Sequence, residues 1–503
     1  MRWLLALLRA LLVRRDHPKG MVRPWALAAP VLVLLVTLPL LRPIRFPDPR
    51  DVGDDEQALL ATTQALVEFD TPAIDQTQFT ATRRKFERTG PAGMARWYAD
   101  QPPTTAALLS VGYRLIRHYG LTFAKDGPTV AYLLTLLGTT IPAACAAGLV
   151  YRMGRLFDLA RPRRALLAAA CVFGTGLLSY ATVLNAHVPA ATLVLASAAC
   201  LVHLAIATRR PVVPVWLFAA GLCAALAAAL DPSALPFLPL MAAVTLTFRW
   251  RWWARAGGLV LFVAGAAGPA VLHLSLTLPV TGDPFQGMGF APTSVALPDP
   301  LGTHAGPPGG GADGPDWAVP DDADDPPTAW RTARQTAGSV AAGLFGAHGL
   351  LSHFPVLAVG VLGMTMVMHR HWPQAAKVLA AATVAGAVFL LVAYAAHRPP
   401  GVGWRDAMFA ARWFVVFGPL LLVWAGAWLR RPHRRGSWAV VGALLAFSAA
   451  VGVVGATRPW PRDGYRRYTA AEAARKLWRG ESASPPRTTL AGPDWGSAGG
   501  DAR

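Results

Sequence analysis

The chain consists mainly of apolar runs of about twenty residues, separated by short polar linkers. A helix of that length crosses the hydrocarbon core of a bilayer, which is about 30 Å thick at 1.5 Å per residue. Charged residues make up only 15% of the chain and the mean hydropathy is +0.37, whereas a soluble domain is about a quarter charged. The sequence therefore predicts an all-α, polytopic transmembrane helix bundle.

The apolar runs predict about eleven spans. They cover residues 22–41, 127–149, 164–183, 188–207, 212–230, 234–248, 257–277, 352–368, 378–396, 409–429 and 437–456. Arginine-rich linkers such as YRMGRLFDLARPRR and RRPHRRG alternate with linkers that carry few basic residues. Basic loops stay in the cytoplasm. This alternation predicts a multi-pass membrane protein with its N-terminus in the cytoplasm.

Three parts follow from this topology. Residues 1–20 form a basic amphipathic segment on the cytoplasmic surface, 21–456 the transmembrane domain, and 457–503 a polar extracytoplasmic tail. The first extracytoplasmic loop, 42–126, contains EQALLATTQALVEF and TTAALLSVGYRLIRHYG, whose helical periodicity predicts two amphipathic interfacial helices. The loop at 278–340 is rich in Pro, Gly and Asp, which predicts a mobile segment.

The net charge of +19 is compatible with nucleic-acid binding, but the arginines lie in the short linkers where membrane orientation requires them. Nucleic acid is therefore not expected as a partner. The four cysteines all fall inside apolar runs, so neither a disulfide framework nor a zinc site is indicated.

Polar residues gather at the predicted outer ends of the spans, and the inner linkers carry mainly arginine. Each outer residue also has a structural explanation: the acids can cap a helix, Asn185 and His187 can close a turn, and Arg412 can extend to the interface. Their shared side nevertheless predicts a site at the outer membrane interface. The candidates are Asp54, Asp55, Glu56, Asp100, Gln101, Asn185, His187, Asp231, Ser352, His353, Arg405 and Arg412.

Several motifs resemble those of the GT-C superfamily of membrane glycosyltransferases, close to the protein O-mannosyltransferase and aminoarabinose-transferase branch and its uncharacterised bacterial relatives. An acidic pair opens DDEQALLATTQALVE after the first span, and LNAHVPAA, GLFGAHGLLSHFPVL and WRDAMFAAR follow in the order seen in that branch. A Tyr-Asp-Lys-Pro-Pro motif is similar to residues 98–103, with two departures: Ala99 lengthens it and Gln101 replaces the lysine.

The resemblance implies a protein of the bacterial cytoplasmic (inner) membrane. It also implies transfer of a sugar from a polyprenyl-phosphate-linked donor to a lipid, glycan or protein acceptor outside the membrane. It implies that Asp55, with Asp54 and Glu56 as alternatives, accepts the acceptor's proton. Arg83, Arg84, Lys85 and Arg412 are the candidate contacts of the leaving phosphate. No cofactor is expected. A divalent metal at the carboxylates stays open, although no oxygen cage is recognisable.

Two other functions fit a chain of this kind. A transporter or flippase of a lipid-linked solute normally places polar residues near the bilayer midplane, where this sequence is mostly Leu, Ala and Val. A catalytically inactive GT-C-like scaffold is the other alternative, because Gln101 and the lengthened motif depart from the family pattern.

Overall fold

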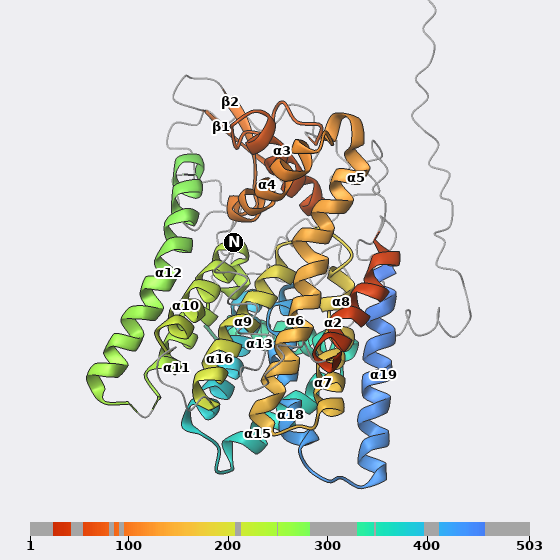
Figure 1. Cartoon of the computed structure of the whole chain (residues 1–503), viewed down its shortest axis with the longest axis vertical. Coiled ribbons are helices and arrows are strands. Elements are labelled where there is room, and N and C mark those ends of the chain that lie inside the picture. The colour runs from red at the N-terminus through yellow and green to blue at the C-terminus, as the bar shows by residue number, and fades with distance from the viewer. Residues whose placement is uncertain are drawn as a thin grey trace, which may run out of the picture.

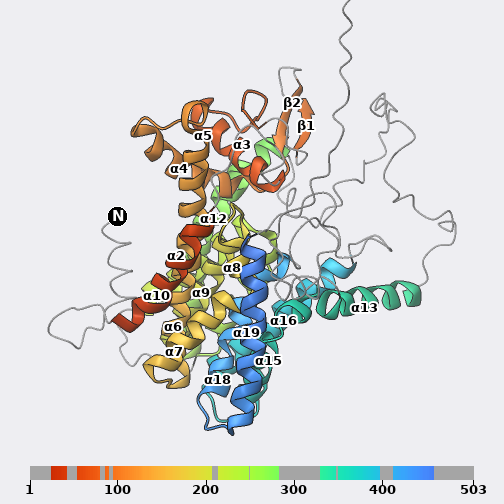
Figure 2. The ribbon, with the colours of Figure 1, turned by 90° about the vertical axis from the view of Figure 1, so that its right-hand side faces the viewer.

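A computed structural model describes residues 24–41, 54–79, 85–89, 95–206, 213–248, 250–281, 329–346, 349–396 and 412–457. Helices stack side by side in one bundle, and a smaller cap formed by α3, α4 and a β-hairpin covers one end (Figures 1 and 2). The predicted segments 1–20 and 457–503 lie outside the described residues, apart from Thr457, which ends the last helix.

The cap is built from the first loop. Its elements are α3 (Asp54–Glu68), β1 (Lys85–Thr89), β2 (Ala95–Ala99) and α4 (Pro103–His118). The two predicted amphipathic segments are therefore both helical. The hairpin was not predicted: its strands pair antiparallel, with Lys85 opposite Ala99, and add a small sheet to the expected all-α fold.

The ends of the cap helices follow from their sequence. Carboxylates in the first turn of α3 are favourable because a helix N-terminus carries partial positive charge. Pro102 and Pro103 fix the start of α4, and Arg117 and His118 lie in its last turn, where positive charge is favourable.

The cap helices differ in exposure. α3 is buried along most of its length, whereas α4 buries one face against a core around Tyr113 and Phe123. The other face of α4 presents an apolar stripe of helical spacing, formed by exposed Leu108, Val111 and Leu115. Such a stripe suits a helix that lies on a membrane surface, as the sequence predicts for α4.

The bundle follows the predicted spans. Its helical segments are α2 (Pro24–Thr37), η1 (Leu38–Leu40), α5 (Phe123–Thr135), η2 (Leu136–Thr140), α6 (Ile141–Met153), η3 (Gly154–Phe157), α7 (Arg161–Phe173), α8 (Leu177–Tyr180), α9 (His187–Ile206), α10 (Val213–Leu230), η4 (Pro232–Ala234), α11 (Phe237–Thr245), α12 (Trp252–Thr281), α13 (Ala329–Phe345), α14 (Leu350–His353), α15 (Leu357–Met368), α16 (Gln374–Ala396), η6 (Arg412–Val415), α17 (Gly418–Val423), α18 (Ala425–Leu429) and α19 (Arg435–Thr457).

Six described helices are long and apolar enough to cross a membrane. A seventh span exists if the helical segment Thr336–His353 and α15, which meet at an angle of 96°, are counted as one. The predicted number of eleven is therefore not confirmed. The other four predicted spans coincide with shorter or broken helices, at α2, α7–α8, α11 and α17–α18. The chain is a multi-pass membrane protein.

Glycines lie at a helix break and at close helix contacts. Between α7 and α8, a Cβ on Gly174 would lie 2.7 Å from the Ala170 carbonyl oxygen. The contact of α10 with α12 is close: a Cβ on Gly221 would lie 1.9 Å from the Phe262 carbonyl oxygen, and one on Gly265 would lie 2.1 Å from that of Phe218. Small residues let helices approach in this way inside a membrane.

The segment predicted as a mobile loop at 278–340 is helical at both ends, because α12 extends to Thr281 and α13 begins at Ala329. The residues between them lie outside the described part of the chain.

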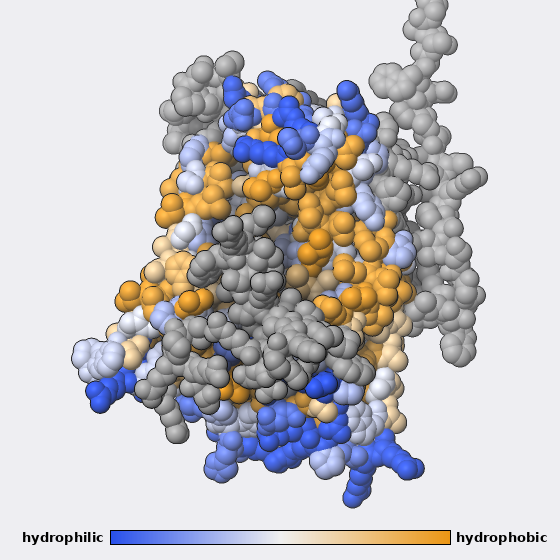
Figure 3. Space-filling view, viewed as in Figure 1, coloured by the Kyte–Doolittle hydropathy of each residue, from blue (hydrophilic) through white to orange (hydrophobic). Residues whose placement is uncertain are grey.

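Polarity divides the molecule into three zones. Hydrophilic surface gathers at the two ends, and an apolar band lies between them (Figure 3). The basic connections α6–α7, α11–α12, α15–α16 and α18–α19 lie toward the end of the bundle opposite α3 and α4 (Figure 1). The linkers that the sequence assigns to one side therefore meet at one end.

Candidate functional site

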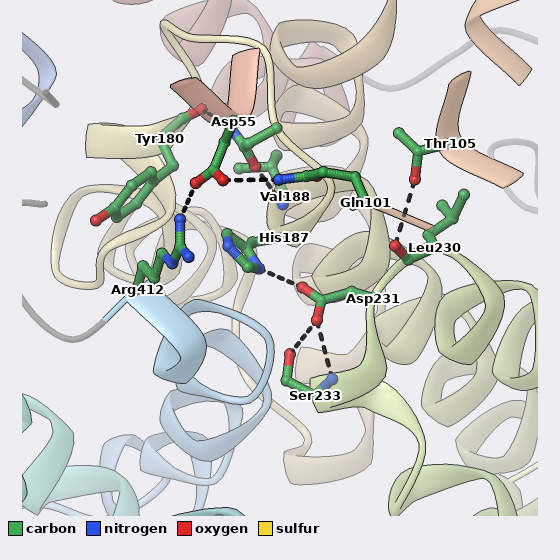
Figure 4. Close-up of polar contacts among 11 residues, drawn as sticks. Asp55, Gln101, Thr105, Tyr180, His187, Val188, Leu230, Asp231, Ser233 and Arg412 are labelled. Atoms are coloured by element: carbon green, nitrogen blue, oxygen red, sulfur yellow. Dashed lines mark hydrogen bonds and ion pairs between the residues drawn. The ribbon is translucent and has the colours of Figure 1, made fainter. Parts of the chain in front are cut away.

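Asp55 lies at the start of α3, where the cap meets the bundle. Its side chain is 8% exposed, and both carboxylate oxygens are bound: Oδ1 accepts a hydrogen bond of 2.8 Å from Gln101 Nε2, and Oδ2 forms an ion pair with Arg412 Nη1 (Figure 4). Gln101 precedes α4 and Arg412 begins η6, so this carboxylate joins three segments that are distant in sequence. The side chain of Asp54 lies outside the described residues.

Glu56 ties α3 to the turn between α8 and α9. It is 3% exposed, and its Oε1 accepts a hydrogen bond of 3.0 Å from the Leu184 backbone N–H. Asn185 holds this turn. Its amide donates to the carbonyls of Tyr180 (2.6 Å) and Val183 (2.8 Å), and its Oδ1 accepts from Val188 N–H (3.0 Å) at the start of α9. These bonds join the end of α8, the turn and the start of α9.

His187 follows as the first residue of α9, and its Nδ1 pairs with Asp231 Oδ2. Asp231 lies at the end of α10, where Oδ1 accepts from Ser233 N–H (2.9 Å) and Ser233 Oγ–H (2.6 Å). Burial acts to raise the pKa of Asp231, but the charge of His187 and the hydrogen bonds from His187 and Ser233 outweigh it and hold this pKa below its ordinary value. The Asp231 carboxylate is therefore ionised.

Two threonines at the start of α4 attach the cap to the bundle beside this pair. Thr105 Oγ1 donates to the Leu230 carbonyl (3.3 Å), and Thr104 Oγ1 lies 3.1 Å from Nδ1 of the buried His273 in α12. These two threonines and His273 are site residues that the sequence did not single out. Their signal was weak: hydroxyl groups directly after Pro-Pro, and a histidine inside an apolar run.

The predicted residues divide into three groups. The first group contains Asp55, Glu56, Gln101, Asn185, His187, Asp231 and Arg412, and we call it the network. Direct contacts join Asp55 to Gln101 and Arg412, and His187 to Asp231, while Glu56 and Asn185 bind backbone groups of the α8–α9 segment. Figure 4 shows the two side-chain clusters near each other. Asp100 is half-buried directly before Gln101. Arg83, Arg84 and Arg405 lie outside the described residues.

The last group forms local contacts. Lys85 Nζ lies 4.9 Å from the ring centroid of Trp97 on the paired strand. Ser352 Oγ donates to the carbonyls of Gly346 (2.7 Å) and Gly349 (2.9 Å), and Nδ1 of the fully buried His353 lies 2.9 Å from the latter oxygen. These bonds close the turn around α14.

An apolar pocket lies beside the network. It is lined by Tyr180, Phe354, Phe414 and neighbouring residues of α8, α14 and η6. Tyr180 also makes an edge contact with the His187 ring, with centroids 6.4 Å apart, and Phe414 is two residues after Arg412. In the described part of the chain, no group of three or more His, Cys, Asp or Glu residues is arranged to hold a metal ion.

The arrangement combines a held carboxylate, a buried guanidinium and a carboxylate-bound imidazole at the border of an apolar bundle. Chemically, such a set can accept a proton at Asp55 and stabilise an anion at Arg412. Ionised Asp has about four lone-pair sites and Arg has five N–H donors, so each group can serve its partner and a substrate together.

Comparison with known proteins agrees with the fold. No protein-family model matches the chain, and no curated protein matches it. The apo oligosaccharyltransferase of Archaeoglobus fulgidus has a similar structure, with a TM-score of 0.50 and 13% identity over 92% of this chain. The match spans 58% of that protein. ArnT from Cupriavidus metallidurans, solved bound to undecaprenyl phosphate, gives a TM-score of 0.49 and 14% identity over 86% of this chain and 70% of its own.

Both proteins are GT-C glycosyltransferases. At this level of identity, the likeness concerns the fold. The chain is therefore similar in fold to the oligosaccharyltransferase, in line with the resemblance of its motifs.

Proposed function

We propose that the chain is a membrane glycosyltransferase that moves a sugar from a polyprenyl-phosphate-linked donor to an acceptor at the extracytoplasmic face. The observation that carries this proposal is the buried Asp55–Arg412 pair, which joins the cap to the bundle within a network of polar side chains. The similarity of fold and the family-like motifs around these residues support it.

The side of the membrane follows from charge. Basic linkers remain in the cytoplasm, and the described basic connections lie at the end of the bundle opposite the cap (Figure 1). Under this rule the cap, the α8–α9 turn and the start of η6 face outward. We infer a cytoplasmic N-terminus on the same ground, and the bacterial cytoplasmic (inner) membrane from the resemblance of the motifs.

The proposed reaction needs a base and an anion site. The acceptor hydroxyl oxygen attacks the anomeric carbon, its proton passes to Asp55, and the bond from that carbon to the phosphate oxygen breaks. The products are the glycosylated acceptor and the polyprenyl phosphate. Arg412 binds the phosphate as negative charge develops on it.

The ion pair links the two tasks. A phosphate that approaches Arg412 shares the guanidinium with Asp55 and weakens its hold on that carboxylate. Asp55 then becomes a better proton acceptor when a donor is present. Gln101 keeps the carboxylate oriented meanwhile through its 2.8 Å hydrogen bond.

A deletion strain tests the proposal. Glycolipids and glycoproteins of that strain are compared by mass spectrometry after complementation with the wild type, Asp55→Asn or Asp158→Asn. Asp158 is the matched control, because it also pairs with an arginine, Arg430, but is 73% exposed. Its φ of 52° suits asparagine equally well.

We expect a glycosylated product that disappears on deletion and returns with the wild type and with Asp158→Asn. With Asp55→Asn it should fall at least a hundredfold, because loss of general base catalysis costs about 10²–10⁴-fold. Equal membrane levels of the variants exclude a defect in expression. Full restoration by Asp55→Asn would contradict the assignment and favour an inactive scaffold. Accumulation of an unchanged lipid-linked donor on the inner side of the membrane would favour a flippase.

A further inference from the structure

The His187 ring forms a described hydrogen bond through one of its two nitrogens. Its Nδ1 pairs with Asp231, whose second oxygen is fixed by both the backbone and the hydroxyl of Ser233. A carboxylate bound in this way fixes the orientation of the imidazole and places a proton on Nδ1. The other nitrogen, Nε2, then faces away from Asp231.

Nε2 is available for a ligand. The His187 side chain is 15% exposed, and Nε2 makes no hydrogen bond with any residue that the structure describes. In Figure 4 the ring lies between Asp231 and the Asp55–Arg412 pair, with its second nitrogen on the side of that pair. The edge contact with Tyr180 limits rotation of the ring.

The Asp231 carboxylate needs a positively charged partner. Asp231 is only 2% exposed, and a buried carboxylate is stable as an anion only when a cation and hydrogen bonds compensate it. Ser233 supplies hydrogen bonds but no charge. His187 is the partner that can supply the positive charge, as an imidazolium whose Nε2–H is a donor.

An anion at this site gains from a second cationic donor. Arg412 already shares its guanidinium with the Asp55 carboxylate. Gln101 is neutral and its amide is turned to Asp55. A phosphate at Arg412 would therefore be bound more firmly with His187 as a further donor. The N-terminus of the 20-residue helix α9 adds a partial positive charge at the same point.

We propose that His187, as an imidazolium, is the second cationic contact of the donor phosphate beside Arg412, and that Asp231 and Ser233 are its positioning residues. The Nε2–H donates to a non-bridging phosphate oxygen in both the donor and the polyprenyl phosphate product, and no proton is transferred. This inference rests on the proposed function and assigns it a further residue for leaving-group recognition.

The test measures binding to the purified full-length protein in detergent. The probes are a polyprenyl phosphate and the polyprenol of the same chain length, which lacks the phosphate. The variants are His187→Gln, His187→Lys and Ser233→Ala. His203→Gln is the matched control, because His203 lies near the other end of α9 and contacts Trp216. Thermal unfolding and size-exclusion profiles select the variants that are folded.

The wild type and His203→Gln should prefer the phosphate over the alcohol. His187→Gln should weaken phosphate binding about tenfold or more, as loss of a charged hydrogen bond does, and leave polyprenol binding unchanged. His187→Lys should recover most of this loss, which a merely structural role would not allow. Ser233→Ala should lose about threefold, because it removes one hydrogen bond behind the pair.

The possible failures are distinguishable. If the wild type shows no preference for the phosphate, the proposed function is contradicted, and this inference with it. If the wild type prefers the phosphate and folded His187→Gln does so equally, the role of His187 is wrong and the proposed function stands. Folded His187→Lys that binds no better than His187→Gln also overturns the role. If neither His187 variant folds, Ser233→Ala decides the test. Phosphate binding by Ser233→Ala as tight as that of the wild type counts against the inference.

Discussion

Two aspartate–arginine ion pairs connect distant parts of the chain at opposite ends of the bundle. Asp55 and Arg412 are 8% and 11% exposed, whereas Asp158 and Arg430, whose charged atoms are 3.2 Å apart, are 73% and 49% exposed. The residue types are the same and the surroundings differ. Because burying a charge pair costs solvation free energy, the buried pair is poorly explained as a device for stability alone. Its burial favours a role of the pair in catalysis or substrate binding.

The largest expected difference between the pairs is in stability. Arg412→Ala leaves the Asp55 carboxylate buried without its cation, which costs about 3–5 kcal/mol for such a pair. Arg430→Ala removes an exposed pair, worth about 0–1 kcal/mol. Apparent melting temperatures in detergent should therefore fall strongly for the first variant and little for the second.

The double variant Asp55→Asn/Arg412→Ala is the control for that comparison. It removes both charges and should melt above Arg412→Ala alone. Equal losses for Arg412→Ala and Arg430→Ala would show that the two pairs do not differ in the way their exposure implies.

A smaller effect concerns the other buried acid, Asp231. Its pKa is lowered in the folded protein, so its stabilising contribution is full above the ordinary aspartate pKa of about 3.9 and is lost as the pH falls through the lowered value. Asp231→Asn should melt below the wild type at pH 6, and the gap should narrow as the pH falls below about 4. A gap that stays constant down to pH 3 would contradict an ionised Asp231.

The smallest effect is the response to salt. Raising the salt concentration to 1 M shortens the screening length to about 3 Å and should erase most of the small loss caused by Arg430→Ala. The loss caused by Arg412→Ala should change less, since water and ions are largely excluded from that pair. Melting curves of both variants at low and high salt measure this. If salt changed the losses of both variants equally, the two ion pairs would not differ in their shielding from water and ions.

Much of the fold could be predicted from the sequence. Runs of apolar residues identified the helices, because a helix in lipid must be apolar over its whole length. The alternation of arginine-rich linkers placed Asp55, His187, Asp231 and Arg412 on one side, and the structure pairs Asp55 with Arg412 and His187 with Asp231.

Other features depend on contacts that no local pattern contains. The bond from Gln101 to Asp55 joins residues 46 positions apart, and Glu56 accepts from a backbone group 128 positions away. His353 was grouped with the site by its position in the sequence. Its hydrogen bond to the Gly349 carbonyl lies within the turn of α14.

The close contact between α10 and α12 has a mechanical consequence. Only 22% of the apolar window of α12 is buried, so most of this helix faces lipid, and Figure 1 shows it at the side of the bundle next to α10. Its His273 nevertheless contacts Thr104, three residues after Gln101. A bilayer that forces α12 to tilt would therefore displace the start of α4. Lipid thickness would then change the distance between Gln101 and Asp55.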